Sequence, residues 1–327
     1  MKAILCTQHG LPESLEYADA DDPTPGQGEV LIGVKAAGVN FPDTLIIQGK
    51  YQFKPDMPFS PGGEVAGEVL EVGEGVSHVK PGDRAMALMT WGGYAEKAVV
   101  PGMGVVPMPP DMPFNEAAGF PLVYGTVIHA LKQRGRLQEG ETLLVLGAAG
   151  GVGLAAVQLG RLMGARVIAA ASSQAKLDLC AEHGANELIN YTEGEPLKEQ
   201  VKALTDGNGA DVIFDPVGGD AFDQCLSCIN WDGRLLVVGF ASGRIPEAAA
   251  NRLLLKGCSV IGVFWGKFVQ VDARTNMANF MQLIQWYNQG RFRPVISRTY
   301  PLARAADALN DMLARKATGK LVLETGA

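Results

Sequence analysis

Several features that would assign a chain of this length to a familiar class are scarce here. Among 327 residues there are only five cysteines and four histidines. No apolar run reaches the roughly 18 residues that a membrane helix needs, and residues 1–5 are too short an apolar stretch for a signal peptide. An odd, sparse set of cysteines is typical of reduced thiols. We therefore expect a cytoplasmic protein with no membrane partner.

Positive charge is also in short supply. The chain has 28 Lys and Arg against 35 Asp and Glu, a formal charge of −7. A general nucleic-acid binder needs a net basic surface, so we expect no nucleic-acid partner. Hydrophobic residues make up 47% and charged residues 19%, which excludes global disorder and allows a sizeable core. The length suggests two domains.

Glycine, by contrast, is plentiful, with 41 residues. In the first third of the chain, Gly- and Pro-containing turns separate short runs of strand-forming residues. This pattern favours a small β-barrel, followed by a helix that Asn115 would cap and a longer apolar helix over residues 122–131. The strands are predicted at residues 30–37, 64–72, 84–88 and 94–100.

The middle of the chain alternates between strands and helices, which predicts an α/β domain with a doubly wound parallel sheet. The strands are expected at residues 142–146, 166–171, 188–190, 212–215, 235–239 and 259–264, and the helices at 151–163, 173–183, 196–204 and 220–228. Two helices, 276–288 and 302–315, and a strand, 320–323, complete the chain. We predict a catalytic domain over 1–122, a nucleotide-binding domain over 123–265, and a return to the catalytic domain over 266–327.

The strongest chemical signal is a glycine-rich segment that follows an apolar strand and opens a helix, the context of a dinucleotide-binding loop. Gly150 would let the backbone approach a pyrophosphate, and Gly153 would let the helix pack against the strand. The free N–H groups at the helix start would bind the anion. The alternative is a plain turn between strand and helix. The candidate cofactor-binding residues are Ala148, Gly150, Gly151, Val152 and Gly153.

The next strand indicates which nucleotide is bound. NAD sites place an acidic residue at its end to hold the ribose hydroxyls, but here the chain carries Ser172, Ser173 and Lys176. Two hydroxyls and an ammonium suit the 2′-phosphate of NADPH, and Tyr191 could add a phenolic donor. The alternatives are that Ser172 caps the helix, that Lys176 is a solvated surface charge, and that Tyr191 only packs.

Metal ligands are missing where a zinc alcohol dehydrogenase would need them. Residues 30–130 contain no cysteine and only two histidines, and we interpret Cys225 and Cys228 as core packing. We therefore expect no metal. Without a Lewis acid, a hydride acceptor should already be activated, as in a quinone or an α,β-unsaturated carbonyl.

Several segments together resemble the zinc-independent medium-chain dehydrogenase/reductases, closest to the quinone oxidoreductase, or zeta-crystallin-like, branch. The resemblance covers nearly the whole chain and implies a GroES-like β-barrel domain, a Rossmann domain, and a homodimer joined through Rossmann edge strands near residues 259–264. The matching segments are residues 36–44, 48–51, 61–64, 81–84, 148–153, 189–191, 215–218 and 238–240.

The resemblance also implies a set of site residues. Asn40, Asp43 and Tyr51 would line the substrate cleft, with Thr126 near the nicotinamide. Where metal-using relatives carry Cys and His, this chain has Asn40 and Gly63. The alternative is that Asn40 and Asp43 only fix a loop and that Tyr51 is a buried anchor. Flanking the nicotinamide and its ribose would be Gly239, Phe240, Phe264, Trp265 and Gly266.

These observations predict an NADPH-dependent oxidoreductase that sends a hydride to a quinone or a similarly activated carbonyl, a small-molecule substrate, with the proton taken from water. One alternative is a reductase of enoyl thioesters or acrylate-type compounds. Another is a non-catalytic NADPH-binding protein, against which the acidic charge and the lack of a basic-aromatic stretch argue.

Overall fold

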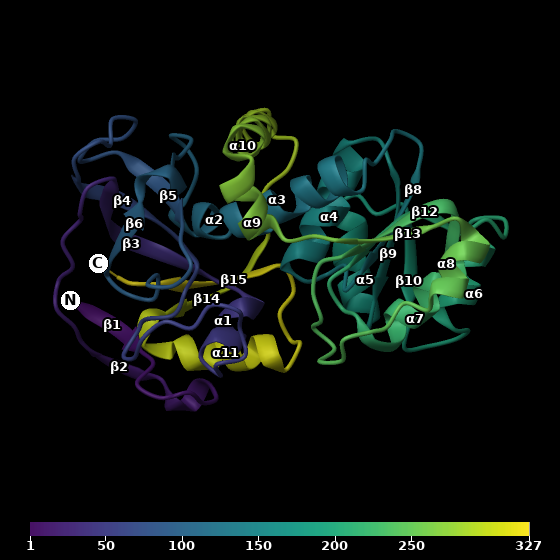
Figure 1. Cartoon of the computed structure of the whole chain (residues 1–327), viewed down its shortest axis with the longest axis horizontal. Helices are drawn as coiled ribbons and strands as arrows, with labels where there is room; N and C mark the ends of the chain where they lie inside the picture. The colour runs from purple at the N-terminus through teal and green to yellow at the C-terminus, as the bar shows by residue number, and fades with distance from the viewer. Residues whose placement is uncertain (327) are drawn as a thin grey trace. The chain divides into compact units, whose positions relative to one another are not determined.

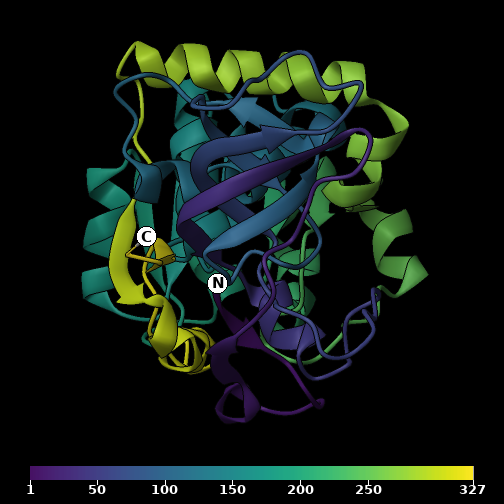
Figure 2. The same cartoon turned by 90° about the vertical axis from the view of Figure 1, so that its left-hand side faces the viewer.

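A computed structural model describes residues 1–326, and the chain divides into two compact units (Figure 1). The first unit joins Met1–Leu122 to the segment that begins at Arg293, and the second unit is Val123–Phe292. Figure 2 shows the purple N-terminal strands and the yellow C-terminal strands in the same unit.

The first unit is built around one long strand, β3 (Glu29–Val39), which pairs antiparallel with three others: β4 (Glu64–Val72), β6 (Lys97–Pro101) and β15 (Lys320–Glu324). One strand can serve three partners because β6 pairs with its residues 29–33 and β15 with its residues 36–39, while β4 pairs along its other edge. The remaining strands are β5 (Arg84–Leu88), β7 (Val105–Pro107), β14 (Ile296–Pro301), and a separate pair, β1 (Lys2–Leu5) and β2 (Glu16–Asp19).

Short helices close this unit around an apolar core that includes Val34, Val65 and Leu323. The α1 helix (Phe41–Ile46) follows β3 directly, so the end of β3 and the start of α1 form one tight corner. The other helical segments are η1 (Pro12–Ser14), η2 (Gly102–Gly104), α2 (Phe114–Ala118), η4 (Leu302–Arg304) and α11 (Ala305–Leu313).

The second unit contains a six-stranded parallel sheet in the order β10-β9-β8-β11-β12-β13. The order reverses between β8 and β11, so the sheet is doubly wound, as the sequence predicted, and its switch point lies at the carboxyl ends of these strands. The strands are β8 (Thr142–Leu146), β9 (Arg166–Ala171), β10 (Glu187–Asn190), β11 (Ala210–Asp215), β12 (Ile229–Val237) and β13 (Ser259–Gly262).

The helices of this unit follow the strands in the alternation expected for crossovers (Figure 1). The α3 helix (Pro121–Ile128) begins in the last two residues of the first unit and continues as a π-helical turn, η3 (His129–Arg134). The others are α4 (Gly151–Leu162), α5 (Gln174–Glu182), α6 (Leu197–Leu204), α7 (Gly219–Cys228), α8 (Ala250–Lys256), α9 (Trp265–Val271) and α10 (Ala273–Asn288).

The structure places the return to the first unit at Arg293, so residues 266–292 group with the second unit rather than with the first. Aromatic packing explains this. The ring of Trp265 packs on Phe280, with centroids 6.2 Å apart, and Tyr124 lies 4.7 Å from Phe292. The first contact joins α9 to α10, Trp265 also packs on Gly125 of α3, and the second contact joins the chain after α10 to α3.

The start of α2 differs from the prediction. The α2 helix starts at Phe114 after Pro113, so Asn115 lies inside the helix and does not cap it. Within residues 1–326, no helix combines the length and the apolar character that a bilayer crossing requires.

Candidate functional site

The glycine-rich loop lies at the carboxyl end of β8, beside the switch point of the sheet. Gly147 adopts a φ of 56°, which favours glycine, and Gly150 is the N-cap of α4, where it contributes no side chain. The first intrahelical hydrogen bond runs from the Leu154 N–H to the Gly150 carbonyl. The N–H groups of residues 151–153 therefore have no partner within the helix, and they form an anion-binding helix start.

Gly153 packs where no side chain fits. An added Cβ there would lie 2.2 Å from the Gly147 carbonyl oxygen and 2.9 Å from the Ala148 Cα. At Gly150 an added Cβ would meet only the Gly147 carbonyl oxygen, at 3.4 Å, which is ordinary contact. Gly153 is thus required by the loop itself, whereas the space beside Gly150 is open to a ligand.

The carboxyl ends of β9 and β10 bring the predicted phosphate ligands together. The two strands pair in parallel with Asn190 opposite Ala171, and the Tyr191 N–H donates to the Ala171 carbonyl at 3.2 Å. The Lys176 ammonium donates to the Ser172 Oγ at 3.3 Å.

The helix that follows begins with Ser173, not Ser172, as its N-cap, and the Ser173 hydroxyl makes no capping bond. The tip of the β9–α5 connection therefore presents hydroxyls, one ammonium and no carboxylate.

A buried carboxyl shapes the other side of the switch point. The Oδ1 of Asp215, the last residue of β11, accepts the N–H groups of Val217 and Gly218, each at 2.8 Å. Its Oδ2 is buried and has no hydrogen-bond partner within residues 1–326, and burial raises the pKa of this carboxyl. Asp215 thereby fixes the turn that packs on Gly147, since Val217 lies 3.1 Å from where a Cβ of Gly147 would be.

Of the residues predicted to lie beside the nicotinamide, some are exposed to a ligand, and one has a side chain that already packs and hydrogen-bonds within the protein. Gly239 and Phe240 follow β12 and are held to the 215–217 turn, where the Ala241 N–H donates to the Pro216 carbonyl. Phe264 and Gly266 are exposed. The Trp265 indole, however, is only 4% exposed, because it packs on Gly125 and donates to the Asn276 Oδ1 at 3.0 Å.

Trp265 therefore has only backbone groups to offer a cofactor. Thr126, which lies beside Gly125 on α3, is half-buried, and its hydroxyl has no hydrogen-bond partner within residues 1–326.

In the first unit, Asn40 and Asp43 form the corner between β3 and α1. The Asp43 Oδ2 accepts the Asn40 backbone N–H at 2.7 Å and the Tyr94 hydroxyl at 2.7 Å. Burial raises the pKa of the Asp43 carboxyl to about 6, although these two hydrogen bonds lower it. Asp43 thus uses one oxygen to hold the corner, which favours a structural role for it.

Tyr51 follows α1 and is half-buried against the core of the first unit. Its ring centroid lies 5.8 Å from that of Phe53, and its hydroxyl has no hydrogen-bond partner in the described part of the chain. Burial and the negative charge of Asp43 raise the pKa of the phenol, so it remains protonated at neutral pH. The ring edge and the hydroxyl are therefore available to a bound molecule.

Two residues that sequence reasoning did not select complete the corner. The Lys320 ammonium lies 2.7 Å from the Glu64 Oε1 and donates to the Asn40 Oδ1 at 2.5 Å. Glu64 also accepts the Asn40 Nδ2 at 2.9 Å. The only signal in the sequence was the position of Glu64 inside the Pro-Gly-Gly-Glu segment, and nothing singled out Lys320.

The cysteines and histidines do not gather into a metal site. Cys225 and Cys228 lie in the apolar core of the second unit. Over residues 1–326, no three His, Cys, Asp or Glu side chains are grouped so that they could hold a metal ion. The donor set required for structural or catalytic zinc is therefore not assembled by these residues.

Both units of the chain are similar to known protein families. Residues 26–110 match the alcohol dehydrogenase GroES-like domain, and residues 151–286 match the family described as zinc-binding dehydrogenase. A quinone oxidoreductase-like protein 2 homolog from Nematostella vectensis is 41% identical over 99% of this chain and 89% of its own length.

Solved structures agree with this over the whole chain. Escherichia coli quinone oxidoreductase, solved as a complex with NADPH, matches with a TM-score of 0.92 and 28% identity over 99% of this chain and 100% of that one. CurK enoyl reductase matches with a TM-score of 0.89 and 27% identity over 99% and 98%. The chain belongs to the zinc-independent medium-chain dehydrogenase/reductases, in the quinone oxidoreductase family, which confirms the GroES-like and Rossmann domains.

Proposed function

We propose that this protein is an NADPH-dependent oxidoreductase that transfers a hydride to a quinone or a similarly activated carbonyl compound. The observation that carries the proposal is the full-length similarity to quinone oxidoreductases, one of them solved with NADPH. The glycine-rich loop supports it, because the N–H groups of residues 151–153 have no partner within α4 and the space beside Gly150 is open, which suits a pyrophosphate.

We assign residues of the second unit to each part of the cofactor. The N–H groups of residues 151–153 would bind the pyrophosphate. Ser172, Ser173 and Lys176, with Tyr191 beside them, would bind the 2′-phosphate, since charge-assisted hydrogen bonds to phosphate are strong. The nicotinamide ring and its ribose would be surrounded by Gly239, Phe240, Phe264, Gly266 and Thr126. When bound, the reduced nicotinamide supplies the hydride.

The first unit would hold the acceptor. The Tyr51 ring offers an aromatic face for stacking, and Asn40 lies in the preceding corner. Water would supply the proton, because Asp43 already holds the backbone of Asn40 and the hydroxyl of Tyr94. No metal takes part in this scheme.

A panel of acceptors tests the proposal. NADPH oxidation is followed with quinones, enones and enoyl thioesters, and with no acceptor as the control. We expect turnover of quinones, and NADPH deuterated at the transferred position should slow the reaction where hydride transfer limits it. Tight NADPH binding with no turnover of any acceptor would instead indicate a non-catalytic binding protein.

The similarity to CurK enoyl reductase favours a second candidate, the reduction of an α,β-unsaturated thioester or ketone. The hydride would then go to the carbon β to the carbonyl and leave a delocalised enolate. The same panel separates the two, because an enoyl reductase should prefer enoyl thioesters and convert simple quinones slowly.

We further propose a homodimer that pairs through β13. This strand is the edge of the parallel sheet, and none of its residues is buried. An uncovered edge strand offers backbone groups to a second chain. Sedimentation should show a dimer, and Val260→Pro should shift it toward monomer. The Val263 N–H donates to the Val237 carbonyl of β12, so the alternation along the strand turns the Val260 N–H to the outer edge. A wild-type monomer at micromolar concentration would refute this assembly.

A further inference from the structure

The short helix α9 of the second unit depends on aromatic side chains for its position. Trp265 is its only buried residue, and Phe268, three residues later, is half-buried. Residues three apart lie on the same face of a helix. Through this face, α9 contacts α3 and its π-helical continuation η3 at two points.

The two contacts are both made by rings. A Cβ added to Gly125 would lie 2.3 Å from a ring carbon of Trp265, so the indole lies directly against α3. The imidazole of His129 stacks on Phe268, with ring centroids 3.9 Å apart and the ring planes 17° from parallel. Because Gly125 and His129 are four residues apart, the two contacts lie one above the other on the same face.

The His129 ring is held from its other side by an amide pair. Its Nδ1 lies 3.3 Å from the Gln133 Oε1, within hydrogen-bond distance. The side-chain amides of Gln133 and Asn279 exchange two hydrogen bonds, each of 3.1 Å, and Asn279 is buried on α10. Burial lowers the pKa of His129, so the ring is uncharged at neutral pH. The imidazole is therefore a neutral ring with a fixed orientation.

The helix that carries His129 changes its geometry at this residue. The π-helical turn η3 begins at His129, and the Gly135 N–H donates to the Ala130 carbonyl, five residues earlier, at 2.7 Å. Such turns are rare inside α-helices and occur frequently at functional sites. The residue that stacks on α9 therefore lies where the regular α-helix ends and the π-helical turn begins.

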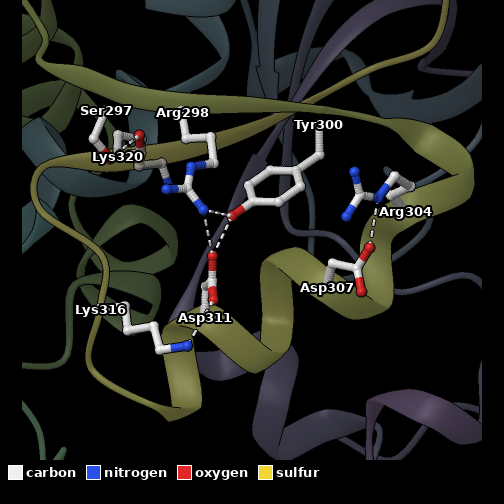
Figure 3. A network of polar contacts seen from close by, with 8 residues as sticks. All are labelled: Ser297, Arg298, Tyr300, Arg304, Asp307, Asp311, Lys316 and Lys320. Carbon is white, nitrogen blue, oxygen red and sulfur yellow. Dashed lines mark hydrogen bonds and ion pairs between the residues drawn. The ribbon is translucent and has the colours of Figure 1, made fainter.

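A short helix of the first unit is attached in a different way. Figure 3 shows the Arg298 and Tyr300 side chains of β14 meeting Asp311 of α11, at 2.8 Å and 2.5 Å. Within residues 1–326, α9 takes part in no ion pair, and its one side-chain hydrogen bond to another element is that of the Trp265 indole to Asn276. The position of α9 is therefore set by the packing of rings.

The start of α9 lies on the side of the sheet edge where the nicotinamide would bind. A dinucleotide crosses the carboxyl edge of a doubly wound sheet. Since the proposed 2′-phosphate site lies beyond β9 and β10, the nicotinamide end would extend over β11, β12 and β13. The chain runs from β13 into Phe264 and Gly266, which are both exposed.

We propose that His129 is a positioning residue for the nicotinamide half of NADPH. Its stack on Phe268 fixes the first turn of α9 and so holds Phe264 and Gly266 beside the nicotinamide and its ribose, while His129 itself does not touch the cofactor. This inference rests on the proposed function, in which Phe264 and Gly266 adjoin the nicotinamide. The stack should then matter for the nicotinamide half of the cofactor and not for the adenine half.

Two nucleotides separate these halves. NADPH contains the nicotinamide, whereas 2′-phospho-ADP-ribose keeps the 2′-phosphate and the pyrophosphate and lacks the nicotinamide. Dissociation constants of both are measured by calorimetry for the wild type, His129→Ala, Phe268→Ala and the double variant. Val271→Ala, at a position of α9 that is 72% exposed, is the matched control. Thermal unfolding checks the fold of each protein.

The effect on the two nucleotides should differ. His129→Ala should weaken NADPH binding about fivefold, as for the loss of one aromatic pair, and 2′-phospho-ADP-ribose binding by less than about twofold. Phe268→Ala should act alike, and the double variant should bind NADPH about as well as either single variant, because both changes remove the same contact. Phe268 is half-buried, so its variant still decides the question if the cavity left by His129→Ala unfolds the protein.

Three results would overturn the inference. They are an equal weakening of both nucleotides, unchanged NADPH binding in a folded Phe268→Ala protein, and losses that simply add in the double variant. A Val271→Ala protein that loses as much NADPH affinity as Phe268→Ala would also count against the stack.

Turnover gives a second readout and separates this inference from the proposed function. With a quinone and saturating NADPH, kcat of the folded variants should fall, and the isotope effect with deuterated NADPH should rise, because a displaced nicotinamide slows hydride transfer. A wild type that binds NADPH and reduces no acceptor would refute the proposed function, while the two dissociation constants would still decide the role of His129. A fully active wild type whose folded variants match it in binding and turnover would refute the role of His129 alone.

Discussion

The two units prepare their proposed sites in different ways. In the second unit, the proposed site is formed mainly by the backbone. It consists of the N–H groups of residues 151–153, Gly147 with its positive φ, and Gly153, where no side chain fits. In the first unit, the proposed site is held by hydrogen bonds between buried side chains, those of Asp43 with Tyr94 and of Asn40 with Glu64 and Lys320.

This difference determines what can be seen in the sequence. A backbone site is local, so glycines within seven residues of one another reveal it. A side-chain site is assembled by the sheet from distant segments, and Lys320 and Asn40 are 280 residues apart. Buried polar networks also depend strongly on every member, because an unpaired group in a low dielectric is costly. The first unit should therefore be the more sensitive to charge, and the second the more sensitive to volume.

The largest expected effect concerns the charge of Asp43. Its pKa is raised to about 6 in the folded protein, whereas an unfolded aspartate has a pKa of 3.8. Between these values the folded state holds a proton that the unfolded state has released, so this group contributes stability at acid pH that is lost as the pH rises toward 6. The loss should amount to about 3 kcal/mol, since one pKa unit corresponds to about 1.4 kcal/mol.

Urea unfolding from pH 4 to 7.5 measures this effect. Asp43→Asn should remove the decline that the wild type shows across the window, while Asp307→Asn, on the exposed face of α11, controls for the change in net charge. Parallel curves for wild type and Asp43→Asn would mean that Asp43 is ionised throughout.

The second prediction tests sensitivity to volume. Gly153→Ala brings a Cβ within 2.2 Å of a backbone oxygen, so the loop must shift. We expect a loss of stability of about 1–3 kcal/mol, as for other overpacked sites, together with weaker NADPH binding. Gly150→Ala is the matched control. Its Cβ has room at 3.4 Å, so stability should hold while NADPH affinity falls if the pyrophosphate lies beside it. Equal melting temperatures for Gly153→Ala and wild type would contradict the packing argument.

The third prediction asks whether the first unit uses a ring or a hydroxyl. Tyr51→Ala should lower kcat/KM about tenfold, or about 1.4 kcal/mol, through lost stacking, with NADPH affinity little changed. Tyr51→Phe keeps the ring and removes a hydroxyl that has no hydrogen-bond partner in the described structure, so it should remain close to wild type. If Phe were as harmful as Ala, the phenol itself would be taking part.

The sequence was sufficient wherever local patterns decide the structure. The bounds of β4, β5, β8 and β9 were predicted to the residue, because apolar runs between glycine turns define them. The predictions omitted α8, which has no buried residue and so no periodic apolar face, and also the short α9. The sequence predicted the return to the first unit at residue 266, whereas the structure places it at Arg293. The prediction missed this because the aromatic contacts of Trp265 join residues that are distant in the sequence.

The same division holds for the site. The glycine loop and the tip beyond β9 lie where the sequence indicated. Glu64 and Lys320 were not found, because a lysine at the start of an apolar strand is ordinarily taken for an exposed strand end. Only the pairing of β15 with β3 shows that this lysine points into the first unit.

The smallest expected effect lies at the tip beyond β9, where backbone and side chains contribute together. We expect NADPH to bind at least about tenfold more tightly than NADH. Lys176→Ala should remove about fivefold of that preference, or roughly 1 kcal/mol, because Lys176 is half-exposed and salt screens its charge. Ser172 and Ser173 remain to bind the phosphate, and NADH affinity should not change.

Dissociation constants for both nucleotides at low and high salt measure this, with Lys198→Ala on α6 as a matched control for the lost charge. Since the Lys176 term is electrostatic, the wild-type preference should shrink with salt while that of Lys176→Ala shrinks less. A preference that is unaffected by both the substitution and the salt would assign 2′-phosphate recognition to the hydroxyls of Ser172, Ser173 and Tyr191, and would make this tip a neutral hydrogen-bonding site like the glycine loop.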